Sequence, residues 1–126
     1  MKAELDQWFV FSGKKGFRRV QVKTISHILC EDYVCKLHLI NKADPVVCSK
    51  SLRHFEQALP KETFVRIHHY AIVNLWHVHE VQCAGRQRHA VMSDGTALPI
   101  SVRKWPAFRD AFRVHLLSVQ SGTLTK

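Results

Sequence analysis

Apolar and polar residues alternate along most of the chain in short runs, which is the pattern of half-buried β-strands. The alternation predicts strands at residues 8–11, 17–22, 25–30, 33–40, 46–48, 64–68, 71–73, 78–83, 87–92 and 96–100. The strongest hairpin signal is the Asp94-Gly95 pair between two alternating runs. Because the strands follow one another closely, we expect antiparallel hairpins rather than βαβ units. The predicted fold class is mostly β, with about nine or ten strands and one or two short helices.

One stretch, residues 49–59, changes to the period of an α-helix. Its apolar residues recur at i, i+3 and i+7, and they are Leu52, Phe55 and Leu59. Either Ser49 or Ser51 is suited to cap the first turn, because both side chains can accept a bond from a free backbone N–H. Pro60 is expected to end the helix.

A second helix is predicted near the C-terminus from the stripe Trp105, Phe108, Phe112 and Leu116. We expect its aromatic rings to pack on the sheet and its arginines, Arg109 and Arg113, to be solvated. The alternative is that this helix contributes to a dimer or touches phosphate.

Length and composition indicate one folded domain. The chain has 126 residues, of which 46% are hydrophobic. This is enough for a hydrophobic core that needs no disulfide or metal ion to stabilise it. We assign the domain to residues 1–117 and a polar, flexible tail to residues 118–126. No apolar run is long enough to cross a membrane, and no secretory signal precedes the first strand. These features predict a cytoplasmic protein without a membrane partner.

The charge balance points to a polyanionic partner. Lys and Arg number 19 and Asp and Glu number 10, which gives a net charge of +9. Three basic clusters coincide with predicted turns or junctions: residues 14–19, residues 66–70 and the pair Arg103-Lys104. Each cluster alone is also compatible with an ordinary solvated surface.

Signatures of enzymes and metal sites are missing from the sequence. It contains no phosphate-binding glycine loop and no nucleophile elbow. His77 and His79 could share one strand face, but no third ligand follows at a suitable spacing. The cysteines fit no zinc pattern and are expected to be reduced strand residues: Cys30, Cys35, Cys48 and Cys83. We therefore predict no enzyme activity, no cofactor, no metal and no small-molecule substrate.

Residues 64–75, FVRIHHYAIVNL, resemble the hallmark of LytTR DNA-binding domains. That hallmark is an apolar–apolar–Arg–apolar–His segment followed by variable residues and Ile/Val-Val-Asn. Residues 93–104, SDGTALPISVRK, resemble the closing hairpin of the family and its Ser-x-Arg motif. Residues 25–39, with the turn EDYV, resemble the early strands, and residues 52–60 resemble the leucine-rich helix that ends in Leu-Pro. The resemblance covers about residues 7–113, nearly the whole chain.

The resemblance implies a bacterial transcription regulator with an elongated stack of small antiparallel sheets. Domains of this kind serve as effector domains of response regulators and place loops in successive major grooves of double-stranded DNA. With only six residues before the first predicted strand, we expect this chain to be either a stand-alone regulator without a receiver domain or a fragment of a longer one. We also expect a homodimer on repeated half-sites, because one domain covers few base pairs. The alternative is a basic β module that binds RNA, another polyanion or a protein partner without reading a DNA sequence.

Matching the motifs residue by residue gives a set of candidate DNA contacts. By this resemblance Arg103 is the base-reading arginine, His69 is a loop residue that faces DNA, and Lys36 follows a third contacting turn. Two candidates have structural alternatives, because Asn74 can shape a turn and His68 can be a buried, hydrogen-bonded histidine. The complete predicted set is Lys36, Lys50, Ser51, Arg66, His68, His69, Asn74, Ser101, Arg103 and Lys104.

Overall fold

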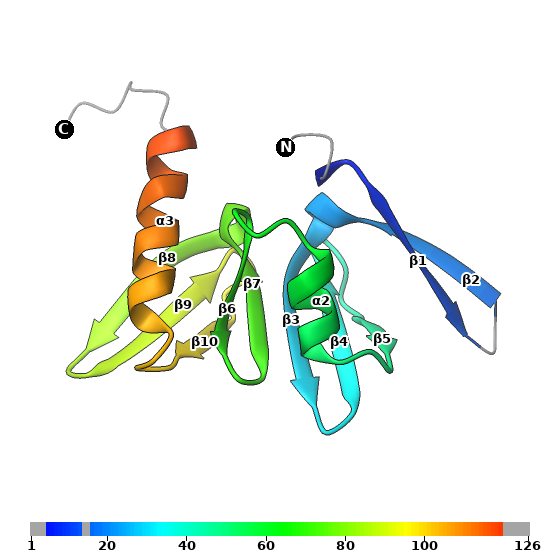
Figure 1. Cartoon of the computed structure of the whole chain (residues 1–126), viewed down its shortest axis with the longest axis horizontal. Helices are drawn as coiled ribbons and strands as arrows, with labels where there is room; N and C mark the ends of the chain where they lie inside the picture. Colours follow the sequence, from blue (N-terminus) through cyan, green and yellow to red (C-terminus); the bar gives the residue numbers. More distant parts are fainter. Residues whose placement is uncertain (1–4, 14–15, 120–126) are drawn as a thin grey trace.

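The computed structural model describes residues 5–13 and 16–119. Within these residues, ten strands form three antiparallel sheets that lie side by side along the longest axis of the molecule (Figure 1). The predicted mostly β class, with small antiparallel sheets and two helices, is confirmed. In the described part of the chain, no helix is both long and apolar enough to cross a membrane.

The first sheet is a hairpin of β1 (Trp8–Gly13) and β2 (Gly16–Gln21). Its strands match the predicted aromatic run and the alternating run that follows. The two lysines predicted in its turn, Lys14 and Lys15, lie outside the described residues. A 3-10 turn, η1 (Val22–Thr24), leads from β2 into the second sheet.

The second sheet has five strands in the order β5-β4-β3-β7-β6. Its strands are β3 (Ile25–Glu31), β4 (Val34–Leu39), β5 (Val46–Cys48), β6 (Phe64–His68) and β7 (Ala71–Asn74). The outer strand β6 and its neighbour β7 are joined by a short turn, as are β3 and β4. Each of the two turns therefore brings its flanking residues close together.

Helix α2 (Leu52–Ala58) connects the two edge strands of this sheet, β5 and β6. Of the two predicted caps, Ser51 is the one that the structure uses: its side chain accepts a 3.1 Å bond from the backbone N–H of His54. The helix ends before Leu59 and Pro60, as predicted.

The third sheet consists of β8 (Val78–Ala84), β9 (Gln87–Met92) and β10 (Ala97–Ile100), with β9 in the middle. A second 3-10 turn, η2 (Leu75–His77), joins it to β7. Helix α3 (Trp105–Val119) follows β10 and stands against this part of the molecule (Figure 1).

The central sheet carries a hydrophobic cluster on each face, because side chains alternate along its strands. Ile72 of β7 belongs to a cluster shared with Val20 of the hairpin and Phe55 of α2. Its neighbour Val73 belongs to a second cluster, shared with Met92 of the third sheet and Phe108 of α3. The central sheet is thereby packed against the hairpin and α2 through one cluster, and against the third sheet and α3 through the other.

Helix α3 agrees only in part with its predicted stripe. Phe108 is fully buried, and Trp105 and Phe112 pack against the second cluster. Leu116 is 49% exposed, so the prediction that it belongs to the packed stripe is wrong. The helix also runs to Val119, two residues past the predicted domain boundary at 117, and residues 120–126 lie outside the described part.

Cys30 and Cys35 contradict the prediction that all four cysteines are reduced. They face each other in the β3–β4 register, with Cα atoms 4.0 Å apart, and form a disulfide. The reason is the short turn between them, in which Asp32 adopts a φ of 58° that Asp tolerates better than most residues. Cys48 and Cys83 are free.

The suggested metal pair of His77 and His79 does not share a strand. His77 ends η2, and its ring Nε2 lies 3.0 Å from the carbonyl oxygen of Lys23. His79 is an exposed residue of β8, 3.9 Å from a carboxylate oxygen of Glu80. Among residues 5–13 and 16–119, no three His, Cys, Asp or Glu side chains gather as a metal site.

Candidate nucleic-acid interface

The connections of the second and third sheets collect along one edge of the molecule. Figure 1 shows the β3–β4 turn, the β6–β7 turn and the β10–α3 connection side by side on this lower edge. The lower end of α2, where the chain arrives from β5, faces the same way. Loops that a rigid sheet holds in a row are a common arrangement of binding residues.

A groove of about 1150 Å³ opens at this edge between the β3–β4 hairpin, the start of α2 and the β6–β7 turn. It brings together five predicted contacts that are far apart in the sequence: Lys36, Lys50, Ser51, Arg66 and His69. Lys36 and Lys50 are both exposed to solvent. We call this lining the basic groove.

The basic groove also contains Arg53, which the sequence prediction missed. Arg53 is an exposed residue of the first turn of α2, two positions after the capping Ser51. Its position near the predicted helix start was the available signal. Acidic side chains are present too, since Glu31 and Asp32 of the β3–β4 turn line the same groove.

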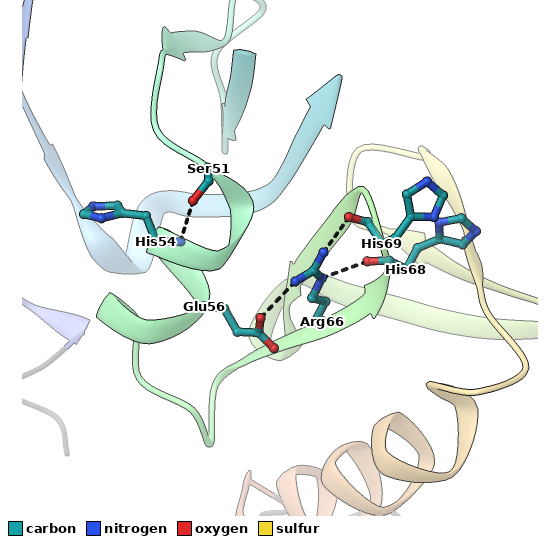
Figure 2. A network of polar contacts seen from close by, with 6 residues as sticks. All are labelled: Ser51, His54, Glu56, Arg66, His68 and His69. Atoms are coloured by element: carbon teal, nitrogen blue, oxygen red, sulfur yellow. Dashed lines mark hydrogen bonds and ion pairs between the residues drawn. The ribbon is translucent and has the colours of Figure 1, made fainter. Parts of the chain in front are cut away.

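Arg66 forms hydrogen bonds within the protein that hold the β6–β7 turn in place (Figure 2). Its Nε donates to the carbonyl oxygen of His68 at 3.2 Å, and its Nη2 donates to that of His69 at 2.6 Å. Its Nη1 donates to Glu56 Oε1 of α2 at 3.0 Å. The guanidinium thus ties the turn to the helix that carries Lys50 and Ser51 at its start, and Arg66 is a positioning residue.

The rings of His68 and His69 point away from Arg66 to a common side (Figure 2). Their centroids are 4.6 Å apart, and His68 also packs on Tyr70 at 4.2 Å. Burial, with a smaller contribution from His69, lowers the pKa of His68, which favours a neutral ring. Within the part of the chain that the structure describes, its Nδ1 is buried without a hydrogen-bond partner, whereas His69 is exposed.

The β10–α3 connection is held beside the β6–β7 turn by one backbone bond. The N–H of Ser101 donates to the carbonyl oxygen of Ile67 at 2.8 Å, directly before His68. The Ser101 hydroxyl then accepts a 3.2 Å bond from the N–H of Lys104, which fixes the start of α3. Between these two anchors lies Arg103, exposed in a tight turn.

Asn74 does not reach this surface. It is fully buried, its Nδ2 donates to the carbonyl oxygen of Ile25 at 2.9 Å, and its Oδ1 accepts from the N–H of Trp76 at 2.9 Å. This is the arrangement that the structural alternative predicts, and it places the Asn74 amide away from the exposed candidate contacts. The other nine predicted residues divide into the basic groove, the β6–β7 turn and the β10–α3 connection.

The described residues therefore form a mostly β module that gathers the basic groove, the β6–β7 turn and the β10–α3 connection along one edge. The model of the LytTr DNA-binding domain family matches residues 15–113 of this chain. The chain belongs to the LytTR DNA-binding domain family, which serves DNA binding in transcription regulation and is not a family of enzymes.

A solved structure agrees with this assignment. The chain is similar to the LytTr DNA-binding domain of a response regulator from Bacillus cereus, with 22% sequence identity and a TM-score of 0.72. The match covers 82% of this chain and 94% of that domain, and at this identity it shows a shared fold. Comparison with curated proteins finds no significant match.

Proposed function

We propose that this domain binds double-stranded DNA at specific sequences in a bacterial cytoplasm and places its row of turns in successive major grooves. The observation that carries the proposal is the bond from Ser101 N–H to the Ile67 carbonyl oxygen. Through this bond, the turn that holds His69 and the turn that holds Arg103 become one rigid surface next to the basic groove.

The proposed roles follow from side-chain chemistry. Arg103 reads a guanine, because a guanidinium can bond O6 and N7 of the base at once. His69 contacts a base edge from the neighbouring turn. Lys36, Lys50 and Lys104 neutralise phosphates, a term that carries no sequence information but supplies much of the affinity. Ser51 can still donate its hydroxyl hydrogen while it accepts the capping bond.

His68 is proposed to act from behind this surface. Its ring is part-buried and in contact with His69 and Tyr70, so it sets the position of both. We further propose that two copies bind repeated half-sites, since one domain covers few base pairs.

Selection of bound duplexes from a random DNA pool near physiological salt tests this function. We expect enrichment of a short motif that recurs at a fixed spacing, and the spacing reports how two copies are arranged. The Arg103→Ala variant, selected in parallel, should lose the preference at one base pair of each half-site. Retention of DNA without any enriched motif would contradict sequence reading and favour the alternative of a basic module for RNA or another polyanion.

A further inference from the structure

All charged residues of the β1–β2 hairpin are basic. Residues 8–21 contain Lys14, Lys15, Arg18 and Arg19 and no acidic residue. The two lysines lie outside the described residues, so the structural argument rests on Arg18 and Arg19 of β2. Both are exposed.

One face of the hairpin anchors it to the body of the protein. Phe9 and Val20 face each other in the register, Val20 is buried, and Phe9 packs with Phe11 against the first hydrophobic cluster. Because side chains alternate along a strand, Arg19 lies on the opposite face, whereas Arg18 faces Phe11 on the anchored side, farther from the base, where it is still exposed. The base of the hairpin is thereby fixed while its basic residues stay in solvent.

Arg19 is also ordered where it stands. Its guanidinium carbon lies 4.2 Å from the centroid of the Trp8 ring on the neighbouring strand. A cation–π contact of this kind orients a guanidinium without removing its charge or its hydrogen-bond donors. Within the described residues, Arg18 and Arg19 form no ion pair with a carboxylate, so their charge is available to an external anion.

The hairpin continues the surface of the basic groove. A second groove of about 630 Å³ separates the hairpin from α2 and is lined by Phe9, Val10 and His54, among others. Ser49 and Lys50 line both grooves, so the two meet at the β5–α2 junction. From there the hairpin extends outward along the longest axis of the molecule, away from the third sheet (Figure 1).

We propose that the β1–β2 hairpin is an arm that binds the phosphate backbone of the duplex outside the bases contacted by the turns, through Arg18 and Arg19. This inference rests on the function proposed above. A planar guanidinium matches phosphate oxygens in a bidentate geometry. A six-residue strand spans about 20 Å at ~3.3 Å per residue, which corresponds to about six base pairs of DNA. The arm therefore lengthens the footprint by about half a helical turn.

The family match alone does not assign this arm. The family model begins at residue 15, so β1 and the ring of Trp8 precede the matched segment, whereas β2 with Arg18 and Arg19 lies inside it.

The test compares three double variants on two duplexes. Arg18→Gln/Arg19→Gln removes the proposed contacts, and Arg18→Lys/Arg19→Lys keeps their charge. Lys42→Gln/Lys61→Gln is the matched control, because it removes two exposed charges from the β4–β5 and α2–β6 connections. The latter connection lies on the edge opposite the turns (Figure 1). One duplex contains only the selected motif, and the other adds ten base pairs on each side.

The measurements are hydroxyl-radical footprinting and the dependence of log K on log salt. On the long duplex, the Gln variant should lose protection over about six base pairs at the end covered by the hairpin. Its salt slope should become shallower by about 1.8, since each phosphate contact contributes about 0.9. On the short duplex it should bind like the wild type, and the Lys variant and the control should keep the long footprint.

Two outcomes overturn the inference, and each is distinct. If the Gln variant keeps the full footprint and slope while the wild type binds its motif, the arm is wrong and the proposed function stands. If the wild type binds neither duplex, the proposed interface and the arm fall together. Circular dichroism and the thermal midpoint show whether the Gln variant is folded. The Lys variant shows whether the footprint depends on the positive charge at these two positions.

Discussion

Arg66 donates a 2.6 Å hydrogen bond to the carbonyl oxygen of His69, so the guanidinium holds the backbone of the residue that we propose to face DNA. A second bond of the same side chain reaches the carbonyl oxygen of His68, and a third reaches Glu56 of α2. An arginine in a DNA-binding motif would first be assigned to phosphate or guanine. Here three of its five N–H donors are used inside the protein, and we propose that its effect on DNA passes through the shape of the turn.

Replacing Arg66 by Lys separates geometry from charge. A lysine keeps the positive charge but cannot make the three bonds of the planar guanidinium. We expect Arg66→Lys to lower the free energy of unfolding by about 2 kcal/mol, since bonds to charged groups contribute about 1.5–3 kcal/mol. Affinity for the selected motif should fall by about tenfold. Urea unfolding and a fluorescence binding titration measure the two effects.

Glu56→Gln is the matched variant for this prediction. Its amide oxygen still accepts from Arg66, and the ion pair that it replaces is part-exposed, with 41% of the Glu56 side chain in solvent. A change of no more than about 0.5 kcal/mol in unfolding is therefore expected. If Glu56→Gln matched Arg66→Lys in both measurements, the ion pair rather than the two backbone bonds would hold the turn.

Arg103 should control base preference. It is exposed between the two anchors of the β10–α3 connection, and Arg103→Ala removes its donors without disturbing either anchor. We expect a loss of about 1–3 kcal/mol on the selected motif and equal affinity for the motif and for its single-base variant at that position. Competition titrations with the two duplexes measure this. Arg109→Ala, at an exposed residue of α3, should leave the preference intact.

The sequence predicted the elements well because each has a local physical cause. Alternation of apolar residues defines the strands, and the stripe Leu52, Phe55 and Leu59 with the cap Ser51 defines α2. The pairing of Cys30 with Cys35 was not predicted, because all four cysteines were expected to be reduced, without regard to the short hairpin turn that brings these positions face to face. The exposed Leu116 was not predicted either, since a helical period does not show where the neighbouring sheet ends.

The candidate site depends more on contacts between distant segments. Nothing in the spacing of residues 56 and 66 indicates that a helix and a strand bring their side chains to 3.0 Å. The same holds for the bond from Ser101 to Ile67, which joins two motifs that the sequence shows only as separate matches. The motifs predicted which residues are candidate contacts. The packing between elements then shows which of these side chains are exposed and which hold the turns in position.

Stability should decrease when the pH falls from about 6.5 to about 4. His27 is buried, and this burial, together with the stacked ring of His38 at 4.5 Å, lowers its pKa to about 4. The unfolded chain binds that proton near pH 6.5, so the folded state holds fewer protons between the two values. The free energy of unfolding is therefore highest above about pH 6.5 and lower by about 3 kcal/mol at about pH 4.

Urea unfolding at pH 7.5 and pH 4.5 measures this dependence. His27→Gln should reduce it, because the variant has no group to titrate at that position, and the part that remains comes from the other histidines whose pKa burial lowers, His38, His68 and His115. The matched variant His79→Gln, at an exposed residue of β8, should keep it. An unfolding free energy of the wild type that stays constant between the two pH values would rule out the proposed role of His27.

Asn74 should affect stability and leave sequence preference unchanged. Its amide nitrogen donates to the carbonyl oxygen of Ile25 at the start of β3, and its amide oxygen accepts a hydrogen bond from the N–H of Trp76. Asn74→Ala leaves the buried Ile25 carbonyl oxygen and the part-buried Trp76 N–H unsatisfied, and we expect it to lower the free energy of unfolding by about 2–3 kcal/mol. Asn74→Asp should cost more, because it loses the donor and buries a carboxylate.

Selection from the random pool distinguishes this role from a contact with DNA. At a temperature where Asn74→Ala remains folded, it should enrich the same motif as the wild type and as Gln57→Ala, a control at an exposed residue of α2. The fully buried amide has no path to a base edge unless β7 opens. A variant with wild-type unfolding and an altered motif would show that β7 does open on DNA and that Asn74 belongs to the interface after all.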